Sequence, residues 1–129
     1  MEQIRVFFFD TYAFFEIAND NLAYEPYTKD IAIITTKLNL MELHYGLLRT
    51  EGEENANIIY NEYSKFVVDF SDEDIKEANK FRLKNKKQDL SYIDCLGYII
   101  ACKKRVKFLT GDQKFKDLDN VEFVEWNTI

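Results

Sequence analysis

Glycine, cysteine and histidine are scarce in this chain, and each shortage excludes a class of site. The 129 residues include 4 Gly, 2 Cys and 1 His. Neither a G-x-G-x-x-G pattern nor a Walker loop is present, so nucleotide-binding folds that depend on glycine-rich loops are excluded. A C-x-x-C pattern is missing and His44 stands alone, which excludes a zinc site built from Cys and His.

Long apolar runs are also missing, so no membrane association is expected. No stretch approaches the roughly 20 apolar residues of a membrane span. We do not expect the opening residues 1–5 to begin a signal peptide, because the apolar run after them is very short. If Cys95 and Cys102 share one helix, they lie about 10 Å apart, beyond the roughly 7 Å reach of a disulfide. We therefore expect two buried free thiols in a reducing, cytoplasmic environment.

Positive charge is outnumbered, with 17 Lys and Arg against 23 Asp and Glu, a net charge of −6 and a pI of about 4.8. Taken alone, this balance opposes a nucleic-acid partner, because phosphate-binding proteins usually carry a basic surface. The objection weakens if several acids share one divalent-ion site. Basic residues do cluster at 80–87 and 103–107. These clusters are either local phosphate contacts or solvated helix faces.

Hydrophobic residues are plentiful, at 47%, and they support a single domain spanning residues 1–129. Apolar runs predict strands at 6–9, 31–35, 66–70, 106–110 and 121–126. Apolar spacing and capping residues predict helices at 11–19, from 39, at 55–64, at 72–84 and from 91. This alternation predicts an α/β fold, a three-layer α/β/α domain with a central, mostly parallel sheet of about five strands. Active sites in such sheets lie at the carboxyl ends of the strands.

Four acids occupy positions where local physics favours other residues. Asp10 ends the first apolar run, and Asp112 follows the fourth predicted strand. Glu42 and Asp94 lie near the starts of two apolar helices. Clustered carboxylates repel one another, and a hard divalent ion such as Mg²⁺ or Mn²⁺ removes that conflict. Such an ion acidifies bound water and stabilises charge on a phosphate, so these acids suggest phosphodiester chemistry.

Local explanations for these acids remain open. Glu42 follows Asn39 by three residues, and Asp94 follows Ser91 by three, which is the spacing of a capping box. Asp10 could be an acid in the first turn of a helix that interacts favourably with the helix dipole. Asp112 could be an ordinary turn residue. The hypothesis of a metal site therefore depends on all four acids occurring together, each beside a strand end or a helix start.

Several nearby residues have a structural as well as a functional interpretation. His44 falls on a different helix face from Glu42, so we expect a residue on the helix surface or at the edge of the core rather than a ligand. Gly46 either lets another element pack closely or is incidental. Aromatic residues near the acids are core residues or stacking surfaces for bases, namely Tyr12, Tyr45 and Tyr92.

At this point the sequence resembles the PIN domain family, and especially the VapC toxin ribonucleases. Phe8–Thr11 is similar to a hydrophobic strand that ends in Asp-Thr, and Asn39–Gly46 to a segment in which Gly follows Glu by four residues. Leu90–Cys95 resembles a helix start that carries an Asp. Leu109–Phe115 contains a Thr-x-Asp-x-x-Phe turn. The segments occur in family order and span nearly the whole chain.

The resemblance implies an Mg²⁺- or Mn²⁺-dependent endoribonuclease in which metal-activated water attacks RNA and leaves a 5′-phosphate. It also implies a homodimer and a toxin that a cognate antitoxin neutralises. The implied metal ligands and catalytic residues are Asp10, Glu42, Asp94 and Asp112. The implied auxiliary residues are Thr11 and Thr110, as orienting hydroxyls, and Asp117.

Three other assignments compete with this one. A phosphoacceptor receiver domain needs an acidic pair near its first strand, where this chain has only Asp10. A dehalogenase-type phosphatase needs Asp-x-Asp, and Tyr12 occupies the second acidic position. The alternative from another functional class is a catalytically silent PIN-like module that binds RNA or protein, which the complete set of acids disfavours.

Overall fold

A parallel sheet forms the centre of the computed structural model, which describes residues 4–125. The strand order is β2-β1-β3-β4, from Ile31–Ile34, Arg5–Phe9, Lys107–Thr110 and Val121–Phe123. Each neighbouring pair is parallel. The predicted α/β class is confirmed, with four strands in place of about five.

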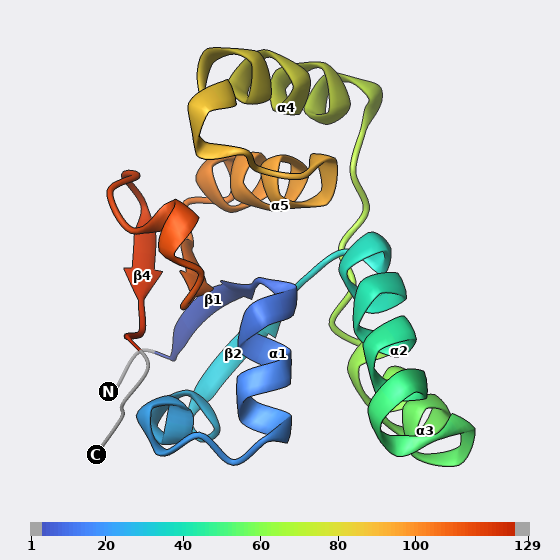
Figure 1. Cartoon of the computed structure of the whole chain (residues 1–129). Coiled ribbons are helices and arrows are strands. Elements are labelled where there is room, and N and C mark those ends of the chain that lie inside the picture. Colours follow the sequence, from blue (N-terminus) through green and yellow to red (C-terminus); the bar gives the residue numbers. More distant parts are fainter. Residues whose placement is uncertain (1–3, 126–129) are drawn as a thin grey trace.

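Helices cover both faces of this sheet and make the predicted three layers (Figure 1). One face carries α1 (Thr11–Ala18), α2 (Lys37–Glu51) and α3 (Glu53–Ser64). The other face carries α4 (Asp72–Lys84) and α5 (Tyr92–Lys103). Short 3₁₀ helices occur in the connections, namely η1 (Leu22–Tyr27), η2 (Lys86–Gln88) and η3 (Gln113–Phe115).

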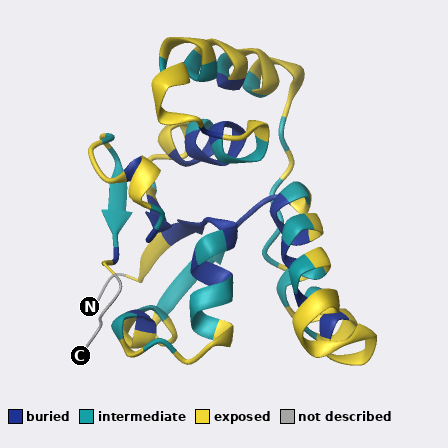
Figure 2. Cartoon of the chain, viewed as in Figure 1, coloured by how far each residue is buried: buried dark blue, intermediate teal, exposed yellow. Residues whose placement is uncertain are grey.

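The phenylalanine run of β1 has no polar alternation because both faces of the strand are covered. Phe7 and Phe9 pack in the core formed with α1 and α2, whereas Phe8 packs in the core formed with α5. The Phe8 ring stacks on Phe108 of β3 with centroids 5.5 Å apart. Figure 2 shows this buried centre in dark blue, with exposed residues on the outer helix faces.

A glycine lets α5 lie directly on that aromatic pair. A Cβ at Gly97 would lie 2.8 Å from the Phe8 ring and 3.3 Å from the Phe108 ring. Real Cβ atoms do not approach a neighbour as closely as 2.8 Å, so any other residue here would push α5 away from the sheet. The spacing between α5 and β1 therefore depends on this residue.

The predicted strand at 66–70 is wrong. Within this segment the chain makes a single parallel bridge, from Val67 to Thr35. Two backbone hydrogen bonds, of 2.9 and 3.1 Å, flank that bridge. The pairing cannot continue because Thr36 is already the N-cap of α2, and beyond that residue the neighbouring chain is helical.

Smaller details of the prediction also change. Cys95 and Cys102 are both free, but only Cys95 is buried, since the last turn of α5 faces solvent. The predicted strand at 121–126 ends at Phe123, and Trp126 lies outside the described residues. No helix within residues 4–125 is long and apolar enough to cross a bilayer.

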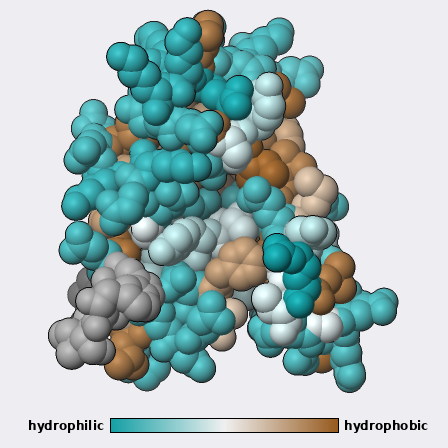
Figure 3. Space-filling model, viewed as in Figure 1, coloured by the Kyte–Doolittle hydropathy of each residue, from teal (hydrophilic) through white to brown (hydrophobic). Residues whose placement is uncertain are grey.

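Hydrophobic side chains gather on the surface where α5 approaches α2 (Figure 3).

Candidate active site

The sheet reverses its strand order between β1 and β3. The chain passes from β1 to β2 on one side and then crosses to β3 on the other. In open parallel sheets, ligands bind at the carboxyl ends of the strands at such a switch point. Asp10 directly follows β1, and Asp112 stands two residues after the end of β3.

Asp10 is the N-cap of α1 and is only 3% exposed. Its Oδ1 accepts a 2.8 Å hydrogen bond from the Thr11 backbone N–H. Its Oδ2 accepts a 2.7 Å hydrogen bond from the Thr110 hydroxyl. Both oxygens of this buried carboxylate are therefore held in place by neighbouring donors.

Glu42 is positioned by a buried hydrogen-bond chain rather than by a helix cap. The N-cap of α2 is Thr36, so the prediction that the helix begins at Asn39 is wrong, and so is the capping-box alternative for Glu42. Asn39 is fully buried, and its Nδ2 donates to Thr11 Oγ1 at 3.1 Å. The Thr11 hydroxyl in turn donates to Glu42 Oε1 at 2.7 Å.

Sequence reasoning missed Asn39 as part of this site. A buried amide is costly unless it is hydrogen-bonded, and this one links the helix cap to the acid-bearing face. Its Oδ1 accepts the Thr36 hydroxyl at 2.6 Å. The available signal was a polar residue one turn before Glu42 on the apolar side of a helix.

Asp94 lies in a capping box and also faces the site. Its Oδ2 accepts from the Ser91 backbone N–H at 2.9 Å, and Ser91 Oγ accepts from the Asp94 backbone N–H at 3.0 Å. The capping-box interpretation is thus confirmed, but the capping box uses only one oxygen of the carboxylate. Within residues 4–125, Asp94 Oδ1 has no hydrogen-bond donor, which leaves it available to a ligand.

Asp112 is tied to Asp10 through one hydroxyl. The Asp112 backbone N–H donates to Thr110 Oγ1 at 3.1 Å, and the same hydroxyl donates to Asp10. Asp112 Oδ1 accepts from the Lys114 backbone N–H at 3.0 Å and so caps η3. The Thr-Gly-Asp turn therefore fixes two acids relative to each other.

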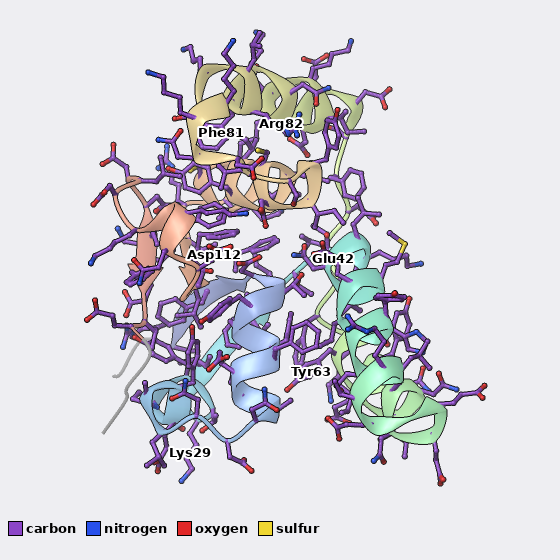
Figure 4. The ribbon with its side chains drawn as sticks, viewed as in Figure 1. Lys29, Glu42, Tyr63, Phe81, Arg82 and Asp112 are labelled. Carbon is purple, nitrogen blue, oxygen red and sulfur yellow. The ribbon has the colours of Figure 1, made fainter. Side chains whose placement is uncertain are left out.

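All four predicted acids line one cavity of about 380 Å³. The residues around it are Asp10, Thr11, Tyr12, Phe15, Glu42, Tyr45, Asp94 and Asp112. In Figure 4, Glu42 and Asp112 come from elements on opposite sides of α1. Thr110 contacts this site through its hydrogen bonds, whereas Asp117 is exposed on the turn after η3 and is not among the lining residues. His44 is half-buried on α2, where its Nε2 is hydrogen-bonded to Asn57 Oδ1, and it is not among the lining residues.

Two glycines allow the walls of the cavity to approach. A Cβ at Gly46 would overlap the ring of Phe15, so glycine is what lets α1 and α2 pack together. A Cβ at Gly111 would lie 2.7 Å from the Val124 backbone oxygen. The interpretation of Gly46 as a close-packing position is confirmed.

The acids resist full ionisation in this cavity. Burial and, to a smaller extent, the nearby Asp94 carboxylate together raise the pKa of Asp10 to about 8, against the opposing hydrogen bonds from Thr110 and Thr11. Burial also raises the pKa of Glu42 and of Asp94. Lys114 acts in the opposite direction on Asp94 by favouring its charged form. Negative charge is therefore under-compensated here unless a cation binds.

The stability of the metal-free protein is expected to fall as pH rises. The folded state keeps a proton on Asp10 to about pH 8, whereas the unfolded chain loses it near its ordinary value of 3.8. This contribution is therefore fully present below pH 3.8 and is lost on the way to about pH 8, at up to about 1.4 kcal/mol per pH unit.

Urea unfolding in EDTA at several pH values between 5 and 9 on a ~1-unit spacing measures that slope. Asp10→Asn should flatten the profile because it removes the titrating group. Equal slopes for the two proteins would show that Asp10 is already ionised in the folded metal-free state.

The donor set fits a hard divalent cation. Four carboxylates provide oxygen ligands without sulfur or nitrogen, which suits Mg²⁺ or Mn²⁺. Within residues 4–125, no group of three or more Asp, Glu, His or Cys side chains is arranged to hold an ion directly. Mg²⁺ commonly retains several waters and uses only one or two carboxylates, so these acids fit an ion bound partly through water.

Comparisons with known proteins agree with this geometry. A model of the PIN domain family matches residues 7–121. VapC20 of Mycobacterium tuberculosis, described as a sarcin–ricin loop cleaving toxin, has a TM-score of 0.76 at 18% identity, covering 92% of this chain and 98% of that chain. VapBC2 from Rickettsia felis, bound to promoter DNA, gives 0.70 at 17% identity, covering 95% and 99%.

A further similar structure is PAE2754 from Pyrobaculum aerophilum, with a TM-score of 0.68 at 12% identity, covering 95% of this chain and 92% of that chain. No curated protein matches the sequence. At these identities the solved structures show a shared fold. The family match extends from β1 to β4 and includes every element that contributes an acid to the cavity, so this chain belongs to the PIN domain family.

Proposed function

We propose that this chain is a metal-dependent endoribonuclease that acts as the toxin of a toxin–antitoxin pair. One observation carries the proposal. Carboxylates from four separate elements line a single cavity at the switch point of a PIN-family sheet. The raised pKa values of Asp10, Glu42 and Asp94 support a site whose ionised form needs a cation.

A bound Mg²⁺ or Mn²⁺ supplies acidity to a water molecule and positive charge to a phosphate. Asp10, Glu42, Asp94 and Asp112 would hold it, directly or through water. The chain's hydroxyls orient these acids: Thr11 donates to Glu42, and Thr110 donates to Asp10. Because such groups fix the direction of the ligand oxygens, they are expected to matter for metal affinity.

The proposed partners follow from the similar structures. VapC20 is described as a toxin that cleaves the sarcin–ricin loop, and VapBC2 is a complex bound to promoter DNA. By analogy we propose RNA as the substrate, a cognate antitoxin as a binding partner and a homodimer as the assembly. The exposed Lys114 beside Asp94 offers a cation at the rim for an incoming phosphate.

The test is cleavage of a panel of structured RNAs by purified protein in Mn²⁺ or Mg²⁺ against EDTA, with thermal unfolding measured in the same buffers. We expect metal-dependent cleavage together with Mn²⁺-dependent stabilisation. The absence of both cleavage and stabilisation would favour the silent binding module. Stabilisation without cleavage would retain the metal site and direct the search to other RNA substrates.

A further inference from the structure

A second pocket of about 210 Å³ lies beside the acidic cavity, between α4 and the first turns of α2 and α5. Its walls are mostly apolar and include Leu38, Phe70, Asn79, Tyr92, Ile93 and Leu96. The hydrophobic surface where α5 approaches α2 in Figure 3 lies in this region. Burying apolar surface here would be favourable for a flat, apolar ligand group.

The pocket and the acidic cavity share two walls. On α2, Leu38 lines the pocket and Glu42, one turn later, lines the cavity. On α5, Ile93 lines the pocket and the next residue, Asp94, lines the cavity. A group seated in the pocket therefore lies next to whatever the acids hold.

The outer wall of the pocket is an aromatic ring under a guanidinium. Tyr92 is 67% exposed, and Arg82 Cζ lies 4.2 Å from its ring centroid. Arg82 is anchored by its Nε, which donates to the Leu90 backbone oxygen at 2.9 Å. No carboxylate within residues 4–125 forms a salt bridge with Arg82, unlike Lys76 and Lys80 on the same helix.

These features favour one occupant. A nucleotide has a π-face for Tyr92, base edges for Asn79 and a phosphate for the unpaired guanidinium. An apolar side chain by itself would fill the pocket but leave Arg82 without an anionic partner. The charge and the shared walls therefore favour a nucleotide linked to the phosphate at the acids.

We propose that this pocket binds a nucleobase next to the scissile phosphodiester, stacked on Tyr92, with Arg82 contacting the RNA backbone. This rests on the proposed ribonuclease function, since it places the base relative to that site. It adds a means of holding RNA on a protein of net charge −6. It also makes Tyr92 a positioning residue for the substrate.

Binding of labelled single-stranded RNA, measured by fluorescence anisotropy in Mg²⁺, tests the pocket. The Asp94→Asn protein serves as the parent so that RNA stays intact. Adding Tyr92→Ala should weaken binding about tenfold, as expected for one lost stacking contact. Tyr92→Phe should restore it, because stacking needs the ring and not the hydroxyl. Ile58→Ala, at an exposed position on α3, is the control and should have no effect.

A series of RNAs, each lacking one base, identifies the stacked nucleotide. For one position, removing the base should weaken binding to the parent but not to the Tyr92→Ala protein, since both changes remove the same contact. Additive losses at every position would overturn the proposal. The proposal would also be overturned if Tyr92→Ala left RNA binding unchanged or if the parent did not bind RNA. It would be overturned as well if Tyr92→Ala changed the oligomeric state without affecting RNA binding.

Cleavage by the protein without Asp94→Asn separates this proposal from the ribonuclease proposal. Base-dependent binding without any cleavage would support the pocket and contradict the nuclease assignment. Metal-dependent cleavage that is unaffected by Tyr92→Ala in both KM and kcat would contradict the pocket and retain the nuclease. The expected result is a raised KM with a smaller change in kcat.

Discussion

Asp94→Asn is expected to lower metal-dependent RNA cleavage by about a thousandfold or more while the protein stays folded. A metal ion stabilises a phosphoryl transition state by several kcal/mol, and about 1.4 kcal/mol corresponds to a factor of ten. The asparagine oxygen can still accept the Ser91 N–H that now bonds Asp94 Oδ2, so the cap of α5 is retained. Initial rates over a range of Mn²⁺ concentrations measure the loss.

The metal-free Asp94→Asn protein should melt at the same temperature as the parent or higher. Burial raises the pKa of Asp94, and the neighbouring Asp112 raises it further, so the charged form is disfavoured in the fold. A neutral side chain removes that penalty. A large loss of stability in EDTA would instead show that Asp94 is mainly structural.

The chain contains a matched control in its other capping box. Asp74 accepts the Ser71 backbone N–H at 2.9 Å at the start of α4, just as Asp94 does at the start of α5. Its pKa is lowered by a hydrogen bond from Lys103, so here the charged form is favoured. Asp74→Asn should cost up to about 1 kcal/mol of stability and leave cleavage intact. Equal loss of cleavage in both variants would point to helix capping and not to a metal site.

Phe8→Ala is expected to lower the free energy of unfolding by about 3–5 kcal/mol. Phe8 is fully buried at the centre of the sheet, where it stacks on Phe108 and lies under Gly97. The substitution leaves a cavity that a rigid sheet cannot collapse to fill. Since domains commonly have about 5–15 kcal/mol of stability, this is a large fraction of the total. Urea unfolding at constant pH measures the change.

Leu22→Ala is the matched control, because Leu22 is 76% exposed. A surface change of this kind should alter stability by no more than about 0.5 kcal/mol. A similar effect of the two substitutions would mean that Phe8 is not at the centre of the core.

The close approach of Gly97 to the Phe8 ring predicts that Gly97→Ala is destabilising in the parent. The loss should be smaller beside Phe8→Leu, where the smaller side chain makes room.

Much of the fold and of the candidate site follows from local patterns in the sequence. The run from Phe7 to Phe9 indicates a strand covered on both faces, and alternating strands and helices indicate a parallel sheet. Ser71 and Ser91, each with Asp three residues later, mark two helix starts that the structure contains. Given a parallel sheet, acids after two strands and near two helix starts must approach the same edge.

Tertiary structure alone decided how those acids are held. Whether residues 66–70 form a strand depends on where a partner ends, and Thr36 ends it by capping α2. The role of Asn39 depends on a hydrogen bond to Thr11, 28 residues away, which no local spacing encodes. The raised pKa of Asp10 likewise comes from burial by distant segments. Local chemistry selects the residues, whereas long-range packing sets their partners and their charge.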